Sequence, residues 1–185
     1  MCGISLSGGG DINGDGFDNI LIEAQNARPN DIGGAGENYI VFGNSMGFSV
    51  AIILADLDGA DNFRLDGISR YDRIGKAVSA AGDINGYFIY DPVILARNVD
   101  QSRGEIYVVF AKTDALDASM SLVCLDGAKG FKLEDVLQGD LAGRTVSDAG
   151  DINGDGFDDI IIGAPEIEKR RGRLYWRCLC ILRKS

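Results

Sequence analysis

A nine-residue segment that occurs three times limits the possible folds of this chain more than any other feature. Its most complete copy is residues 151–159, DINGDGFDD, and a nearly identical copy is residues 11–19, DINGDGFDN. An altered copy, DINGYFIYD, lies between them at residues 83–91. Each copy leads into an apolar run typical of a strand. The chain is therefore a repeat protein, and we expect its fold to be a stack of similar units.

Oxygen-bearing side chains occupy positions 1, 3, 5 and 9 of this loop. Calcium takes six to eight oxygen ligands at roughly 2.3–2.6 Å, so a loop that binds it must curl several oxygens around one point. The glycine at position 6 permits the positive φ of such a turn, and position 7 can offer its carbonyl. The predicted calcium ligands are Asp151, Asn153, Asp155, Phe157 and Asp159 in the third copy, and Asp11, Asn13, Asp15, Phe17 and Asn19 in the first.

The first and third copies differ at position 9. Asn19 offers a neutral amide oxygen where the third copy has Asp159. Losing one negative charge weakens a calcium site, because the ligand charge is a main determinant of affinity. We therefore expect the third loop to bind calcium more tightly than the first.

The middle copy has lost more of the pattern. Tyr87 replaces the acid at position 5, and Phe88 replaces the turn glycine at position 6. The remaining ligand types keep their spacing, but we predict a degenerate, empty site that serves as a hairpin loop of conserved length. The residues of this degenerate site are Asp83, Asn85 and Asp91.

Two other interpretations of the loop were weighed. Segments rich in Asp, Asn and Gly form ordinary turns, because these residues tolerate left-handed backbone and satisfy their own backbone groups. Two nearly identical copies, each ahead of an apolar run, favour a metal loop instead. An EF-hand requires Glu at position 12 and flanking helices, whereas position 12 is Ile22 or Ile162. The EF-hand is therefore excluded.

A common offset of 68 residues relates most of the remaining sequence. Glu37–Phe42 matches Glu105–Phe110 and then Arg173–Tyr175, and only the connection near residues 26–36 is longer. Units built of several short strands, which must stack to bury their faces, are typical of β-propeller blades. The predicted division is blade 1 at 1–67, blade 2 at 68–135, a partial blade 3 at 136–176 and a divergent basic tail at 177–185.

Four short strands are predicted in each complete unit, so the fold class is all-β. The calcium loop joins the first strand to the second in each unit. The first strands are Ile4–Ser7, Lys76–Ala80 and Arg144–Ser147; the second are Asn19–Ala24, Asp91–Ala96 and Asp159–Ala164; the third are Asn38–Phe42, Ile106–Phe110 and Arg173–Tyr175; the fourth lie near Phe63 and Phe131. Segments Ser49–Asp56 and Ser119–Leu125 are compatible with an extra edge strand or with a helical turn.

The chain holds about two and a half units, whereas closed propellers use roughly four to eight blades. We therefore expect an incomplete ring, from a fragment, an oligomerising arc or a product that lost its other blades. The unpaired blade faces of such an arc favour aggregation or pairing with a partner.

Several motifs together resemble a known family. They are Gly-x-Thr-Val-Ser at 143–147, the Asp-x-Asn-x-Asp-Gly-x-x-Asp loop, Ile-Gly-Ala-Pro at 162–165 and Tyr-Val-Val-Phe at 107–110. This combination resembles the FG-GAP repeats of integrin α-subunit β-propellers, most closely the bacterial secreted versions. The resemblance extends to about Tyr175, although the Phe-Gly pair reads Ile-Gly at 74–75 and Ala-Gly at 142–143. It implies calcium in the loops, a seven-bladed ring, and a role in cell adhesion or ligand recognition. It names no protein or glycan ligand.

The charge distribution bears on possible partners. Residues 1–168 carry 28 acids and 11 bases, whereas residues 169–185 carry seven bases and no acid. Nucleic acid requires clustered positive charge, so the acidic body argues against it as a partner. Further blades, from the parent chain or an oligomer, are the expected structural partners.

The composition also argues against an enzyme. The chain has no histidine, which excludes Ser-His-Asp triads, Cys-His dyads and most catalytic zinc sites. Paired carboxylates for glycoside hydrolysis stay open in principle, but the conspicuous pairs lie in the calcium loops. Cys2, Cys124, Cys178 and Cys180 show no zinc-like spacing. A binding module is therefore favoured over an enzyme.

Targeting signals are not visible in the sequence. Met1-Cys2-Gly3 leads directly into the first predicted strand, and no apolar run reaches the length of a membrane span. The calcium loops and the family resemblance imply an extracellular or cell-surface protein, so we expect the export signal to lie outside this chain.

Three functional hypotheses follow. The first is a calcium-stabilised propeller for adhesion or extracellular recognition. The second is a non-catalytic scaffold segment of a larger secreted enzyme, of the phospholipase or polysaccharide-active type. The third is a truncated remnant with no independent activity, which calcium-dependent melting would distinguish from the first.

Overall fold

The computed structural model describes residues 5–48, 51–56, 59, 62–99, 103–112, 118–134, 145–164 and 177–181. Within these ranges the regular elements are β-strands and single turns of 3₁₀-helix, with no α-helix. The predicted all-β class is confirmed. In these ranges, no helix has the length and hydrophobicity needed to cross a membrane.

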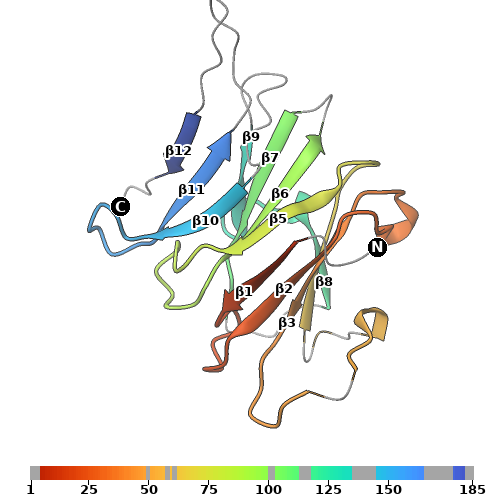
Figure 1. The fold of residues 1–185 in the computed structure, drawn as a ribbon, viewed down its shortest axis with the longest axis horizontal. Coiled ribbons are helices and arrows are strands. Elements are labelled where there is room, and N and C mark those ends of the chain that lie inside the picture. Colours follow the sequence, from red (N-terminus) through yellow and green to blue (C-terminus); the bar gives the residue numbers. More distant parts are fainter. Residues whose placement is uncertain are drawn as a thin grey trace, which may run out of the picture.

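The described strands form three sheets that fan out along the chain (Figure 1). The first sheet has the order β1-β2-β3-β4-β8, the middle sheet β5-β6-β7-β9 and the third sheet β10-β11-β12. Neighbouring strands pair antiparallel, except that β8 pairs parallel with β4. No sheet closes into a barrel, which agrees with the predicted incomplete propeller.

The bounds of the elements follow the chain. The strands are Leu6–Gly10 (β1), Asn19–Ala24 (β2), Glu37–Val41 (β3), Asn62–Asp66 (β4), Ile74–Ala80 (β5), Pro92–Val99 (β6), Arg103–Val109 (β7), Ser119–Ser121 (β8), Gly130–Glu134 (β9), Thr145–Gly150 (β10), Asp159–Ala164 (β11) and Arg177–Ile181 (β12). The 3₁₀ turns are Pro29–Asp31 (η1), Leu54–Asp56 (η2) and Leu122–Cys124 (η3).

Most predicted strands lie within one or two residues of the observed ones, but the last strand differs. The predicted strand at 173–175 lies outside the described residues, and the strand that pairs with β11 is β12, Arg177–Ile181. This segment had been assigned to the basic tail because it breaks the 68-residue match. Its apolar Cys-Leu-Cys-Ile sequence nevertheless suits a strand, so part of the tail completes the third sheet.

The ambiguous segment Ser119–Leu125 contains both of the predicted alternatives. It begins as β8 and continues as the 3₁₀ turn η3. Ser121 caps that turn, because its side chain accepts a hydrogen bond from the Val123 N–H. The corresponding segment in the first unit contains the 3₁₀ turn η2.

The hydrophobic core is divided between two seams, one on each face of the middle sheet. On β6, Ile94 packs in a cluster shared with the first sheet, whereas Val93 and Leu95 pack in a cluster shared with the third. Alternate strand residues point to opposite faces, so a strand buried on both faces must be apolar throughout. Each fully buried side chain of this size contributes about 1.5–3 kcal/mol, and stacking of the sheets supplies that burial.

The outer faces of the first and third sheets are less covered. Leu6 and Ile20 of the first sheet are 64% and 43% exposed, and Ile161 of the third is 37% exposed. The predicted consequence of an open arc, apolar residues on uncovered blade faces, is therefore present in the structure.

Candidate metal centre

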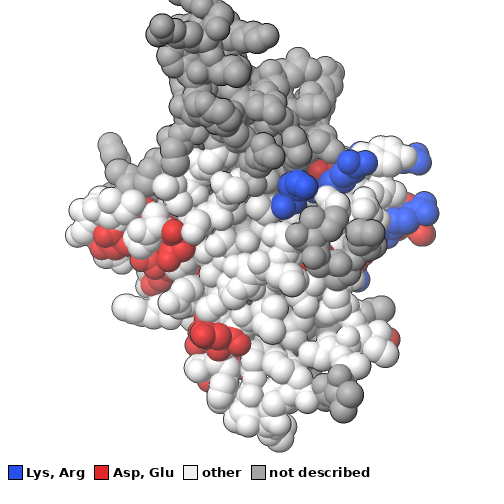
Figure 2. All heavy atoms as spheres, in the orientation of Figure 1, with Lys and Arg blue, Asp and Glu red and all other residues white. Residues whose placement is uncertain are grey.

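The three loops predicted to bind or to have once bound calcium lie beside one another. They join β1 to β2, β5 to β6 and β10 to β11, at the same edge of the three sheets (Figure 1). Figure 2 shows acidic side chains gathered on the side of the molecule from which these loops emerge. The predicted position of the loops, in the hairpin between the first two strands of each unit, is confirmed.

A glycine in the left-handed region turns each first strand into its loop. Gly10, Gly82 and Gly150 have φ values of 61°, 68° and 63°. A side chain at these positions would be strained, because the left-handed region places Cβ too close to the backbone. The strand pairing also shifts register beside Gly10 and Gly150. The loops therefore share one backbone entry, which the sequence repeat encodes.

The aspartate at position 1 organises the backbone in all three loops. The carboxylate of Asp151 accepts the N–H groups of residues 154, 155 and 156, at 2.7, 3.0 and 2.9 Å. Asp11 accepts the equivalent three N–H groups, and Asp83 does the same in the middle loop. This aspartate thus holds the turn by itself, and a loop without calcium keeps its shape.

The side chain at position 9 lies buried at the base of each loop. Asn19, Asp91 and Asp159 are 1%, 0% and 1% exposed. Each accepts the backbone N–H of position 2 through one oxygen, at 2.9, 3.0 and 3.0 Å. Position 9 therefore closes the loop base, a role that the ligand spacing alone did not reveal.

Asp91 is tied more extensively than its two counterparts. Its second oxygen also accepts the Ala111 N–H at 2.8 Å and the Asn85 Nδ2 at 3.0 Å. Burial raises the pKa of Asp91 to about 7, although the N–H groups of Ala111 and Ile84 act in the opposite direction. In the middle loop this carboxylate joins the loop to the end of β7, and it is a structural group.

Positions 3 and 5 carry the remaining predicted ligands. In the first loop, Asn13 Nδ2 donates to Asp15 Oδ2 at 2.9 Å, and Asp15 Oδ1 accepts the Phe17 N–H at 2.9 Å. In the third loop, Asp155 Oδ1 accepts the Phe157 N–H at 3.1 Å. Asn13 Oδ1 is buried and has no hydrogen-bond partner in the described part of the chain. A buried oxygen without a donor is a favourable cation ligand, because leaving it unpaired costs free energy.

The carbonyl at position 7 behaves differently from the prediction in the first loop. Asn19 Nδ2 donates to the Phe17 carbonyl at 3.0 Å. The amide nitrogen thus contacts an oxygen that was predicted to bind calcium. Aspartate cannot make this contact when ionised, since it has no donor. This difference supports the expected ranking of the third loop above the first.

No group of three or more Asp, Glu, His or Cys side chains among the described residues forms a cluster that would hold a metal ion. The loops offer a mixed set of donors instead: two or three carboxylates, one amide and a carbonyl. Calcium accepts such mixed oxygen sets, with water completing its coordination. The donor chemistry therefore fits calcium better than zinc, which selects nitrogen and sulfur ligands.

The middle loop shows what the two substitutions did. Tyr87 and Phe88 are 68% and 95% exposed, and Phe88 takes the position-6 backbone with a φ of 61°. A bulky residue in the left-handed region is an outlier, and its strain is of order 1–2 kcal/mol. The hydrogen bonds of Asp83 outweigh this strain, so the loop keeps its fold without the glycine.

Position 8 is a functional position that the ligand pattern missed. Asp158 Oδ2 accepts the Asp83 N–H at 2.7 Å, and the Asp158 N–H donates to the Asp83 carbonyl at 3.0 Å. One junction earlier, the Tyr90 N–H donates to the Asp11 carbonyl at 3.0 Å. Position 8 of each loop is thus bonded to position 1 of the preceding loop. The repeated acid at positions 18 and 158 was a signal, but it lies outside the alternating ligand spacing.

The sequence of the third loop and its strands decides the family. Residues 144–167 match the family model of the FG-GAP repeat. The chain carries an FG-GAP repeat. The match includes β10, the Asp151 loop and β11, and it confirms the resemblance inferred from the motifs. Together with the all-β stacked sheets, the FG-GAP repeat supports a β-propeller-type module like that of integrin α-subunits.

Proposed function

We propose that this chain is a calcium-binding FG-GAP propeller module that serves extracellular adhesion or ligand recognition. The observation that carries calcium binding is the buried, unpaired Asn13 Oδ1. It lies in a loop whose aspartates already point oxygens inward onto backbone N–H groups. The repetition of this loop ahead of β11, inside the FG-GAP match, supports a second site of the same kind.

The residues that would hold calcium are positions 1, 3, 5, 7 and 9 of the first and third loops. Bound calcium would supply positive charge between carboxylates that otherwise repel one another. Asp11 and Asp151 hold the turns, and position 9 holds the loop base. The protein therefore presents a formed loop, and the ion adds stability by binding the folded state preferentially.

The proposed role is structural and non-catalytic. FG-GAP repeats build propellers, and the loops that bind calcium in this proposal lie at one edge of the stacked sheets. The absence of histidine from the sequence supports the same conclusion. An extracellular or surface location agrees with loops that require calcium concentrations higher than those inside cells.

Calorimetric titration with calcium tests the sites directly. We expect two sites in the full chain, with the Asp151 loop the tighter. Asp155→Ala should remove the tighter site and Asp15→Ala the weaker one, because each removes a charged ligand. With calcium at about one hundred times Kd, each site should stabilise the fold by about 2.7 kcal/mol relative to chelator.

Asp18→Ala is the matched control for this titration. It removes one negative charge from the first loop at position 8, which the predicted ligand set does not use. Both sites should survive this substitution with little change. Equal loss of binding in Asp18→Ala and Asp15→Ala would mean that only net charge matters, and the ligand assignment would then be rejected.

A further inference from the structure

Strand β8 belongs by sequence to the second unit but pairs with the first sheet. It lies between β7 and β9 along the chain, and both of these strands are in the middle sheet. Its residues Ser119 to Ser121 pair in parallel with Arg64 to Asp66 of β4. The Arg64 N–H also donates to the Ala118 carbonyl at 3.1 Å. The second unit thus extends a short strand onto the outermost strand of the preceding unit.

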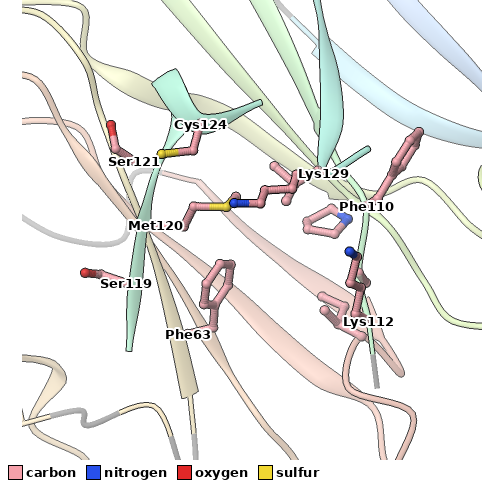
Figure 3. Close-up of a pocket in the computed structure, with 12 residues that line it drawn as sticks. Phe63, Phe110, Lys112, Ser119, Met120, Ser121, Cys124 and Lys129 are labelled. Atoms are coloured by element: carbon pink, nitrogen blue, oxygen red, sulfur yellow. The ribbon is translucent and has the colours of Figure 1, made fainter. Parts of the chain in front are cut away.

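Side chains reinforce this contact between units. Leu122 is 2% exposed in the core cluster that also contains Phe63 of β4, and Met120 packs against that cluster. Figure 3 shows Met120 and Phe63 on the pocket between the two units, with Lys129 reaching toward Met120 from the middle sheet. Backbone pairing and apolar burial therefore act together at the junction.

The first unit has an equivalent of β8. Two flanking elements recur 68 residues apart with identical lengths: η2 matches η3, and β4 matches β9. On the same offset, residues 51–53 match β8. The structure assigns residues 51–53 to no strand. Ile52 and Ile53 are 40% and 62% exposed, although their counterparts, Met120 and Ser121, are half-buried against the preceding unit.

Other apolar residues are exposed on the same side of the first unit. Leu21 of β2 packs toward the middle sheet, so its neighbour Ile20 faces the opposite side, where it is 43% exposed. This is the face on which a preceding blade would stack. A segment that matches a docking strand and an uncovered sheet face thus lie toward the same absent neighbour.

We propose that residues 51–53 are a docking strand for the outermost strand of an FG-GAP-type blade that precedes the first unit. The partner is defined by its chemistry: an edge strand with outward-facing N–H and C=O groups, flanked by an apolar blade face. Pairing would be parallel, as between β8 and β4. Main-chain hydrogen bonds would provide affinity, and burial of Ile52 and Ile53 would reinforce it.

A lengthened chain tests this proposal. An additional copy of residues 73–140, placed in frame before Met1, supplies a blade with its own outermost strand, β9. The repeat spacing is kept, because Gly75 stands 72 residues after Gly3 and 68 before Gly143. The readout is hydrogen exchange by mass spectrometry of the peptide over residues 51–56, at saturating calcium. We expect amide exchange there to slow by about tenfold relative to the unmodified chain.

The control is Lys132→Pro in the added copy only. Lys132 occupies in β9 the place of Arg64 in β4, so proline removes the outward N–H that should pair with the docking strand. Exchange over residues 51–56 should then return to the unmodified rate. As an internal reference, Arg64→Pro in the unmodified chain should speed exchange in β8.

Two results would overturn the proposal. The first is unchanged exchange over residues 51–56 while peptides from both copies of β6 stay protected, which shows that the added blade has folded. The second is slow, concentration-dependent exchange of this segment in the unmodified chain, accompanied by a dimer in sedimentation. That result would make a second copy of the chain the occupant.

Discussion

At the scale of single residues, two positions of the loop do most of the structural work. Position 1 accepts three backbone N–H groups in every copy, and position 9 closes the base. Both roles are present in the middle loop, where positions 5 and 6 have changed. The acid at position 5 and the glycine at position 6 are therefore needed for the ion and for a relaxed backbone, while the turn itself needs only position 1.

This separation of roles predicts that the middle site can be restored. The double substitution Tyr87→Asp and Phe88→Gly recreates the sequence of the other loops, and both side chains are exposed, so no core is lost. Calcium titration should show one additional site. Phe88→Gly alone should stabilise the fold by about 0.5–1 kcal/mol in chelator, because it relieves a left-handed phenylalanine. A double variant that binds no more calcium than the unmodified chain would contradict this prediction.

The buried Asp91 predicts a particular pH dependence. Burial raises its pKa to about 7 in the folded chain, whereas the unfolded value is near 4. Between these values the folded chain holds a proton that the unfolded chain has released. The contribution of Asp91 to stability is therefore greatest below about pH 4 and is lost as the pH rises to about 7.

Chemical unfolding in chelator, measured from pH 4 to 8, tests this prediction. The unfolding free energy should fall by on the order of 1 kcal/mol per pH unit across the window. Asp91→Asn should be less stable, since it exposes the Ala111 N–H to an amide donor, but it should lose this pH dependence. An unchanged slope in Asp91→Asn would assign the effect to other carboxylates.

At the scale of elements, the hairpin loops are joined into a row. Position 8 of each loop bonds to position 1 of the loop before it, at both junctions of the described chain. Position 1 also holds its own turn. The loops therefore contribute to stacking of the sheets, in addition to offering oxygens for an ion.

Asp158 provides the strongest of these links and can be tested alone. Asp158→Ala should lower the unfolding free energy by about 1–3 kcal/mol, because it leaves the Asp83 N–H without its acceptor. Asp158→Asn keeps an acceptor oxygen and should recover most of the loss. Asp18→Ala, at the same loop position in the first unit, should stay within about 0.5 kcal/mol. Equal effects at positions 18 and 158 would show that the bond to Asp83 is not the cause.

At the scale of the whole molecule, stability depends on neighbours. The middle sheet buries both faces, and its strands are apolar at successive positions. The first sheet buries one face and leaves Leu6 and Ile20 exposed on the other. A sheet of this kind cannot bury enough apolar surface alone, which is why repeat units depend on stacking. The docking segment at residues 51–53 extends the same dependence to the edge of the sheet.

The sequence alone determined the repeat, the all-β class, the hairpin position of the loops and their ranking as calcium sites. These properties are local: ligand spacing, glycine placement and strand period are readable within one unit. The strand at β12 was missed, because its sequence leaves the repeat while its composition still suits a strand. Its pairing with β11 depends on a neighbour distant from the repeat match.

Only the tertiary structure showed what depends on contacts between units. The bond from Asp158 to Asp83 joins residues 75 positions apart, and β8 pairs with a strand of another unit. No local pattern specifies such contacts, since they arise when sheets stack and bring separate backbone groups together. The repeated loop therefore combines two kinds of information. Its ligand set is written in nine residues, and its role in joining blades is set by the blade beside it.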